Sequence, residues 1–346
     1  MLLKRLSEAM GPSGFEDEIR NVIREEVTPL VQDIRTDVLG NLLVNNGGVD
    51  KPGPRVMLDA HMDEVGLMIV QVCESGRENG LLKFRALGGI DPRVLVSKPV
   101  FIGEARIPGV IGAKPIHLQA ASERRKPLAM DQLYIDIGAR DAKEARSLVK
   151  PGDVAIFATQ FGEIGEGAIK GKSFDDRLGC ALLIEALRES YDLPLFGAFT
   201  VQEEIGLRGA QAAAYGINPD IAIALEGTVC FDVVGAPSHG QSTVMGAGPA
   251  LTVQDGQTIA DRRFLDFMIH VAQKHGIPYQ LRRVKGGSND FGAIHKVRAG
   301  VIGGGISVPV RYIHAPAQVA SLDDFNNSLL LLKAVLREIE QGGFSL

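Results

Sequence analysis

The sequence predicts an α/β protein that carries a small, β-rich domain inserted into its chain. The chain has 346 residues, of which 45% are hydrophobic, and this is enough for more than one compact domain. After about residue 170, apolar strands alternate with helices, which is typical of a mixed, mostly parallel sheet sandwiched by helices. From residue 67 to 163, short β-like runs alternate with glycine, proline and charged turns. We therefore expect a discontinuous α/β domain of residues 1–66 and 164–346, interrupted by a β domain of residues 67–163.

The N-terminal segment predicts one helix followed by three strands. Ser13 and Glu16 have the capping-box spacing, in which a hydroxyl and a carboxylate satisfy free amides where a helix begins. The apolar positions Ile19, Val22 and Ile23 continue this helix to about Val27. Strands are expected at residues 33–35, 41–44 and 55–61.

The remaining predicted elements fall into the β-rich region and the second half of the chain. The β-rich region predicts one helix, at residues 142–148, and five strands, at residues 67–72, 82–86, 100–102, 110–111 and 133–137. The second half predicts helices and strands in alternation. Its strands are expected at residues 196–201, 221–225 and 299–302, and its helices at residues 177–190, 210–215, around 264–272 and 329–339.

Composition argues against several classes of partner and location. The net charge is −5 with both signs mixed along the chain, and the densest basic run is Arg124 to Lys126, so we expect no nucleic-acid binding. No run reaches the roughly 18 apolar residues of a membrane span, and charges at Lys4, Arg5 and Glu8 interrupt any signal peptide. Three widely spaced cysteines argue against a disulfide framework. These features predict a cytoplasmic protein that binds no membrane.

His61 and Asp63 follow the predicted strand at residues 55–61 directly. In parallel sheets, ligands bind at the carboxyl ends of strands. Residues two apart point to the same side of an extended chain, so His61 could bind a metal while Asp63 orients its ring. This short motif alone is weak evidence for a metal site, because a histidine and an aspartate on an ordinary protein surface would show the same spacing.

Two acidic dipeptides occupy similar positions. Asp175 and Asp176 precede a helix, where capping is the common role of aspartate, so we expect Asp176 to cap and Asp175 to bind metal. Glu203 and Glu204 close the strand at residues 196–201, and two glutamates there are costly unless paired or metal-bound. Because adjacent side chains diverge, Glu204 could be a ligand and Glu203 a general base. A structural salt bridge is the alternative.

Glu226 ends the next predicted strand, and His314 precedes a proline turn. A single histidine is more often structural, but five such sites at strand ends or helix starts together favour a metal centre. Imidazole and carboxylate without thiolate suit zinc, cobalt or manganese in a hydrolytic site. Two histidines with three carboxylates exceed the needs of one catalytic zinc and fit two ions that share a bridging carboxylate and activate a water, whose proton Glu203 could take.

The sequence closely resembles the tetrahedral (TET) aminopeptidases, the glutamyl and deblocking aminopeptidases of metallopeptidase clan MH, some of which have been labelled endoglucanases. Matching motifs include Gly-Pro-Ser-Gly at 11–14, Ala-His-Met-Asp-Glu-Val-Gly at 60–66 and Glu-Glu-Ile-Gly at 203–206. Further matches lie at residues 109–117, 135–139, 174–179, 287–295 and 311–316. They span almost the whole chain in order.

The resemblance implies a ligand set and an assembly. It places one ion among His61, Asp175 and Glu226, and a second among Asp175, Glu204 and His314, with zinc as the expected metal. It implies that Glu203 is the general base and that Asp63 orients His61. It also implies a zinc-exopeptidase type of sheet, an inserted PDZ-like β-barrel that mediates dimerisation, and a homo-oligomer in which dimers assemble into a tetrahedral dodecamer.

Two positions depart from the family pattern, and one further histidine matches it outside the expected site. Many relatives carry aspartate where Glu226 stands, and the longer side chain could alter the affinity of that ion. The family segment Gly-Gly-Thr-Asp-Ala reads Gly-Ser-Asn-Asp-Phe at residues 287–291, so Asp290 aligns while its neighbours differ. His117 also matches a family motif, but a structural role in the β domain is the better interpretation.

The function predicted from these residues is a metal-dependent aminopeptidase that removes N-terminal residues from peptides. A non-catalytic scaffold that kept its metal site, and a glycoside hydrolase, are the alternatives. Glycoside hydrolysis needs two carboxylates that flank a sugar and requires no metal.

Overall fold

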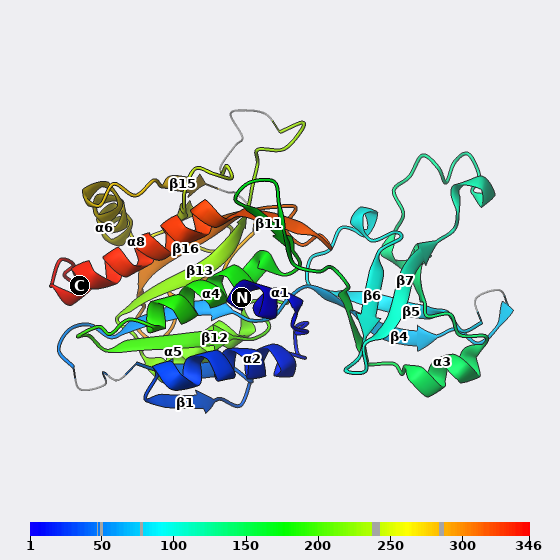
Figure 1. Cartoon of the computed structure of the whole chain (residues 1–346), viewed down its shortest axis with the longest axis horizontal. Coiled ribbons are helices and arrows are strands. Elements are labelled where there is room, and N and C mark those ends of the chain that lie inside the picture. The colour runs from blue at the N-terminus through cyan, green and yellow to red at the C-terminus, as the bar shows by residue number, and fades with distance from the viewer. Residues whose placement is uncertain (47, 49–50, 77–78, 237–242, 284–286) are drawn as a thin grey trace.

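The computed structural model of the chain consists of a larger α/β unit and a smaller β-barrel (Figure 1). It describes residues 1–46, 48, 51–76, 79–236, 243–283 and 287–346. Both termini belong to the α/β unit, and the barrel is formed by an internal stretch of the chain. The predicted fold class, a mixed α/β sheet with an inserted barrel, is confirmed. No helix among the described residues is long and apolar enough to cross a membrane.

The α/β unit is built on an eleven-stranded mixed sheet. Its four central strands are parallel to one another, in the order β12 (Leu195–Thr200), β3 (Val56–His61), β13 (Ile221–Val229) and β16 (Ile302–Arg311). The outer strands pair mainly antiparallel, with one parallel pair among them, so the parallel arrangement expected from the sequence is concentrated at the centre. These outer strands are β1 (Asp33–Thr36), β2 (Leu42–Asn45), β10 (Gly162–Ile164), β11 (Ala168–Gly171), β14 (Ala250–Gln254), β15 (Gln280–Arg283) and β17 (Gln318–Ser321).

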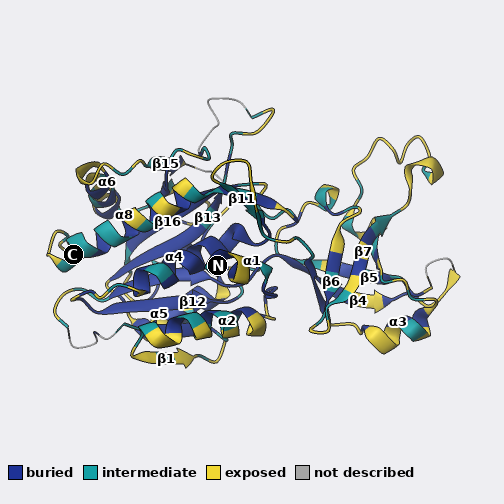
Figure 2. Ribbon diagram, in the orientation of Figure 1, coloured by how far each residue is buried: buried dark blue, intermediate teal, exposed yellow. Residues whose placement is uncertain are grey.

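Helices cover both faces of this sheet because its central strands are apolar on both sides (Figure 2). On β3, Val56 and Leu58 face one hydrophobic cluster and Met57 faces another. The first cluster also contains residues of α1 (Leu2–Glu8), α2 (Asp17–Val27), α4 (Phe174–Leu187), α6 (Arg262–Lys274) and α8 (Leu322–Glu340). The second, richer in alanine, contains residues of α5 (Arg208–Ile217) and α7 (Phe291–Ile294).

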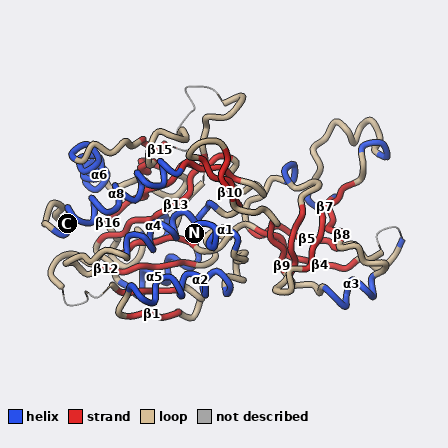
Figure 3. The backbone as a smooth tube through the Cα atoms, viewed as in Figure 1, coloured by secondary structure: helices blue, strands red, loops and turns tan. Residues whose placement is uncertain are grey.

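The smaller unit is a closed barrel of six strands in the order β4-β5-β8-β7-β6-β9 (Figure 3). Its strands are β4 (Gly66–Val72), β5 (Leu82–Leu87), β6 (Pro99–Ile102), β7 (Ile107–Ala113), β8 (Leu133–Asp136) and β9 (Val154–Phe157). The predicted helix is present as α3 (Ala142–Leu148). Because β10 already pairs with β11 in the larger sheet, the chain has returned to the α/β unit by Gly162. The expected domain boundaries at residues 66/67 and 163/164 stay a prediction.

The strand expected at residues 299–302 is wrong, because β16 begins at Ile302 and continues to Arg311. Three successive glycines disguised this strand, and packing explains them. A Cβ atom on Gly303 would lie 1.8 Å from the carbonyl oxygen of Ala222, and one on Gly305 would lie 3.0 Å from Thr252 Oγ1. Close approach of neighbouring elements therefore requires glycine in this buried strand.

The predicted capping box is also wrong, although the helix that follows it ends at Val27 as expected. Helix α2 begins at Asp17, and Ser13 donates its hydroxyl to Asp63 instead. The Glu16 carboxylate is buried and accepts from the amides of Gly14 and Gln202. Burial raises the pKa of Glu16 from 4.5 to about 7. This loop therefore braces neighbouring segments and does not close a helix end.

We expect the buried Glu16 to make stability depend on pH between about 4.5 and 7. The pKa of Glu16 is higher in the folded chain than in the unfolded chain. As pH rises through this window, the free energy of unfolding of the native chain should therefore fall relative to that of Glu16→Gln, by up to about 3 kcal/mol. Urea unfolding of both proteins from pH 4.5 to 7.5 measures the difference. The exposed Glu166→Gln variant is the control. If the difference in free energy of unfolding between the native chain and Glu16→Gln did not change with pH, the prediction would be wrong.

A buried ion-pair network fixes the segment that follows β3. Lys172 Nζ donates to both carboxylate oxygens of Glu64, at 2.8 and 2.7 Å, and to the carbonyl oxygen of Ala9. Arg177 Nη2 lies 3.5 Å from Glu64 Oε1 and donates through Nη1 to the Leu6 carbonyl oxygen. The network therefore joins the end of α1, the start of α4 and the residue next to Asp63.

Lys172→Met should destabilise the protein by about 3–5 kcal/mol, because it leaves the buried Glu64 carboxylate without its main partner. Denaturant unfolding measures this loss. Lys4→Met removes an exposed pair with Glu8, at 4.0 Å, and should cost less than about 1 kcal/mol. Equal losses in the two variants would contradict a structural role for the network.

Candidate metal centre

The predicted ligands meet at the carboxyl edge of the central parallel strands. His61 is the last residue of β3 and lies opposite Thr200, the last residue of β12. The turn that carries Glu203 and Glu204 follows β12. Glu226 lies within β13, and His314 follows β16. Asp175 lies at the start of α4. The parallel register thus brings residues from distant segments to one edge, as the sequence predicted.

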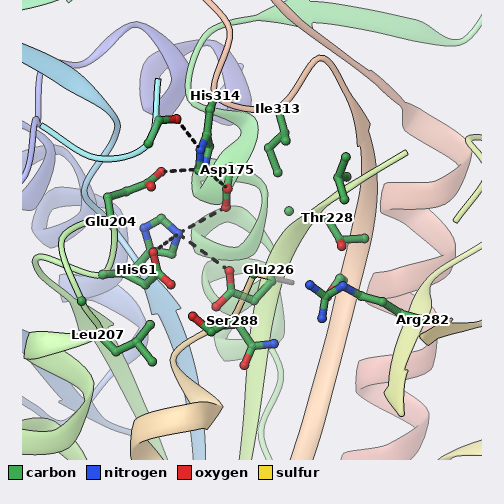
Figure 4. Close-up of a pocket in the computed structure, with 18 residues that line it drawn as sticks. His61, Asp175, Glu204, Leu207, Glu226, Thr228, Arg282, Ser288, Ile313 and His314 are labelled. Atoms are coloured by element: carbon green, nitrogen blue, oxygen red, sulfur yellow. Dashed lines mark hydrogen bonds and ion pairs between the residues drawn. The ribbon is translucent and has the colours of Figure 1, made fainter. Parts of the chain in front are cut away.

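Asp175 faces both histidines (Figure 4). Its Oδ1 lies 3.2 Å from His61 Nε2, and its Oδ2 lies 3.1 Å from His314 Nε2. Glu226 Oε2 lies 3.7 Å from His61 Nε2, and Glu204 Oε1 lies 3.2 Å from His314 Nε2. One carboxylate therefore stands between two imidazoles, and each imidazole has a further carboxylate beside it.

Asp63 lies behind this group and is fully buried. Its Oδ1 lies 3.3 Å from His61 Nδ1 and accepts from the Glu203 amide at 2.9 Å. Its Oδ2 accepts from the Glu204 amide at 3.2 Å and from the Ser13 hydroxyl at 2.5 Å. Asp63 therefore holds both the ring of His61 and the backbone of the two glutamates.

The side chain of Glu203 completes the group. Its Oε2 lies 3.9 Å from His61 Nε2, and the side chain is 11% exposed. Glu203 lines a cavity of about 570 Å³ together with the five expected ligands, which is large enough for an amino-acid residue of a substrate. Solvent and a substrate can therefore reach this carboxylate.

Several residues in or beside the candidate metal centre were not predicted from the sequence. Gly89, in the segment between β5 and β6, accepts from His314 Nδ1 at 2.8 Å. Asp59 is a fully buried carboxyl within β3, and burial and the nearby Asp290 raise its pKa well above the usual range. An acid inside an apolar strand is a signal that the sequence offered, since an unpaired buried charge is costly. Arg282, on β15, also lines the cavity.

Asp176 was expected to cap a helix, and His117 was expected to have no catalytic role. Asp176 accepts from the amide of Gly179 at 2.9 Å, so its predicted capping role is confirmed. His117 lies exposed in the barrel and does not line the cavity.

Comparison with known proteins identifies the family. The model of the M42 glutamyl aminopeptidases matches residues 40–331 of the chain. The chain belongs to the M42 family. It is therefore a peptidase, and the resemblance noted in the sequence is confirmed.

Individual proteins match this chain over nearly their whole length. A protein of Acetivibrio thermocellus is 38% identical over 338 residues, which cover 96% of each chain. The lysyl aminopeptidase of Pyrococcus furiosus is 30% identical, over 99% of this chain and 98% of its own.

Solved structures also match the fold of this chain over nearly its whole length. A TET aminopeptidase from a marine-sediment Thaumarchaeota archaeon has a TM-score of 0.93 at 36% identity, over 99% of this chain and 98% of its own. The TET1 peptidase of Pyrococcus horikoshii, which can assemble into a tetrahedron or a large octahedral shell, has a TM-score of 0.84 at 33% identity. That match covers 96% of this chain and 97% of the other.

The electrostatics of the M42 centre favour a bound cation. Burial by itself would lower the pKa of His61 and His314, but their neighbouring carboxylates raise both, that of His314 to about 11. Burial raises the pKa of Glu203 and Glu226 well above the usual range, and that of Glu204 is raised as well. Burial opposes ionisation of Asp175 too, but its bonds to the two imidazoles lower its pKa overall. More carboxylates are buried here than two imidazoles can neutralise.

The donor set fits divalent metal ions. Three groups of residues each offer three ligand atoms within 4.8 Å of one another: His61, Asp175 and Glu226; His61, Glu203 and Glu204; and Asp175, Glu204 and His314. His61 Nδ1 is held by acceptors of Asp63, and His314 Nδ1 by the Gly89 carbonyl, so the Nε2 atoms face the centre. This is the usual arrangement for a metal-binding histidine, whose second nitrogen is fixed by a hydrogen bond.

We expect removal of metal to destabilise the folded protein, because the buried carboxylates lose a cation that only the folded state can bind. Dialysis against a chelator should lower Tm by roughly 5 °C or more, and Zn²⁺, Co²⁺ or Mn²⁺ should restore it. Differential scanning calorimetry measures the shift.

The same measurement on His117→Ala should give an unchanged shift, because His117 lies outside the cavity. A Tm that is the same with chelator and with metal would show that the carboxylate cluster holds no stabilising cation.

Proposed function

We propose that this M42 chain is an aminopeptidase that removes the N-terminal residue of a peptide with the help of two divalent metal ions. The observation that supports this most directly is the position of Asp175. Its two oxygens lie 3.2 and 3.1 Å from different imidazoles, as a carboxylate shared by two ions would require.

The proposed ligands divide into two groups around this shared carboxylate. His61, Asp175 and Glu226 would hold one ion, and Asp175, Glu204 and His314 the other. We propose zinc, with cobalt and manganese as alternatives, because imidazole and carboxylate donors without thiolate suit all three. When bound, such ions polarise the peptide carbonyl and lower the pKa of a coordinated water.

Glu203 is proposed as the general base and Asp63 as the residue that positions it. A carboxylate at this position can take a proton from a water molecule and return it to the leaving amine. Asp63 accepts from the Glu203 amide and contacts His61 Nδ1, so it fixes the base relative to the ligand. The free amine of the substrate would lie among the carboxylates of the cavity.

The two alternative functions are less well supported. A non-catalytic scaffold has no need for a carboxylate such as Glu203, which faces an open cavity and is assigned to neither proposed ion. A glycoside hydrolase would need a carboxylate pair free to flank a sugar, whereas Asp175, Glu204 and Glu226 here lie against imidazoles. The M42 family match also favours peptides as substrates.

We further propose that the chain forms a homo-oligomer. The shell-forming TET1 peptidase of Pyrococcus horikoshii shares its fold and 33% of its sequence. Dimers joined through the inserted barrel and assembled into a tetrahedral dodecamer are the expected form.

Glu203→Gln should reduce kcat on aminoacyl-arylamides by a factor of about 10²–10⁴, because the amide cannot accept the proton. Metal content, measured by atomic emission spectroscopy, should stay the same as in the native protein. The exposed Glu163→Gln variant should keep full activity.

A fully active Glu203→Gln variant would overturn the assignment of the base. Failure of the native, metal-loaded protein to cleave any member of a broad arylamide panel would instead favour the scaffold.

A further inference from the structure

The turn that carries Glu203 contains a residue in an unfavourable backbone conformation. Gln202, which directly precedes Glu203, has φ of +57°, in the left-handed region that residues with a side chain rarely adopt. Such a conformation persists only where surrounding contacts hold it. Because Gln202 adjoins the proposed general base, a change in its backbone angles would redirect the side chain of Glu203.

Carboxylate oxygens accept from the amides of three successive residues of this turn. Glu16 Oε1 accepts from the Gln202 amide at 3.2 Å. Asp63 accepts from the Glu203 amide through Oδ1, at 2.9 Å, and from the Glu204 amide through Oδ2, at 3.2 Å. Hydrogen bonds to an ionised acceptor are stronger than those between neutral groups. The two acids therefore hold the backbone of the base and of the residue on either side of it.

The loop between α1 and α2 supports both acceptors. Ser13 donates its hydroxyl to Asp63 Oδ2 at 2.5 Å. Glu16 lies in the same loop, and the oxygen that accepts from Gln202 also accepts from the Gly14 amide, at 2.7 Å. Ser13 and Glu16 are each only 3% exposed, so solvent is largely excluded from these bonds. The loop thus reaches the turn by two routes, directly through Glu16 and indirectly through Asp63.

The loop is itself anchored to the segment that follows β3. The Gly11 amide donates to Glu64 Oε1 at 3.1 Å, and the Glu64 amide donates to the Gly11 carbonyl oxygen at 2.9 Å. Gly14 has φ of +85°, a conformation that favours glycine and gives the loop its tight course. The side chains of Ser13 and Glu16 therefore extend from a support that is fixed at its base.

We propose that Glu16 and Ser13 are positioning residues for the general base Glu203, an inference that rests on the proposed aminopeptidase function. Neither residue lines the cavity, so neither contacts substrate there. Glu16 holds Gln202 in its left-handed conformation, and Ser13 holds Asp63. Together they fix the direction of the Glu203 carboxylate, on which proton transfer depends, because a small misplacement of a catalytic group costs much of the rate.

Removal of the acceptor should lower turnover without lowering the binding of substrate or metal. Glu16→Leu should reduce kcat on aminoacyl-arylamides by about 10- to 100-fold and change KM by less than about threefold. Metal content should stay at the native level. Glu16→Gln keeps an oxygen that can accept from the Gln202 amide, so it should recover most of the lost kcat.

Ser13 provides a second test that does not depend on whether Glu16→Leu folds. Ser13→Ala removes the donor to Asp63 and should reduce kcat by about 3- to 10-fold at unchanged metal content. Ser13→Thr keeps the hydroxyl and should recover this loss. If Ser13→Ala and Glu16→Leu kept the native kcat, or if each lowered metal content together with kcat, the proposal would be wrong.

A variant that destabilises the fold elsewhere separates positioning from stability. Val335 is fully buried in α8, which packs against α4 and α6. Val335→Ala should lower Tm because it leaves a cavity, but it should keep the native kcat. If kcat in Val335→Ala, Glu16→Leu and Ser13→Ala simply followed the loss in Tm, Glu16 and Ser13 would be structural residues only.

Hydrogen–deuterium exchange, followed by mass spectrometry, tests the support of the turn independently of turnover. Glu16→Leu should speed exchange at residues 202–204 by about tenfold or more and leave exchange in α3 of the barrel unchanged. If the native, metal-loaded protein cleaves no arylamide but exchange in the turn depends on Glu16, the support of the turn stands and the aminopeptidase assignment fails. If arylamides are cleaved and neither kcat nor exchange depends on Glu16 or Ser13, the aminopeptidase stands and the positioning role fails.

Discussion

The contact of one carboxylate with two imidazoles organises this site. Asp175 lies between His61, which ends β3, and His314, which follows β16, and β3 and β16 flank β13. The remaining acids pack around this pair. Such a concentration of buried carboxylates is unfavourable unless cations accompany it. The folded chain therefore has a strong electrostatic reason to take up divalent ions where the ligand atoms converge.

The dipeptide Asp63–Glu64 illustrates two ways in which the fold handles a buried acid. Glu64 turns toward Lys172 and Arg177, so the charges of the protein itself compensate it. Asp63 turns toward the site and is stabilised by backbone amides, the Ser13 hydroxyl and the ring of His61. One acid thus anchors the loop to the α/β unit, while the next sets the position of the groups that would perform the chemistry.

Much of this arrangement could be predicted from the sequence because it follows from strand ends. His61 ends the apolar strand β3 and Glu203 lies just beyond β12, and a parallel sheet brings such ends together. Glu226 was expected at the end of its strand, whereas β13 continues past it to Val229. The contacts that were missed join residues far apart in sequence, such as Ser13 with Asp63 and Gly89 with His314. The course of β16 beyond Ile302 was missed because its glycines satisfy packing against neighbours and carry no strand propensity.

The hydrogen bond between His314 and Gly89 gives the smaller unit a chemical part in the site. A carbonyl oxygen can only accept, so Nδ1 of His314 must carry the proton, and this selects the tautomer whose Nε2 lone pair is free for a metal. Gly89 lies on the segment that connects two barrel strands, β5 and β6. A tilt of the barrel against the sheet would lengthen this bond and separate Nδ1 of His314 from its acceptor. Contacts that held the barrel in place would, through the same bond, hold the tautomer of an imidazole on the opposite unit.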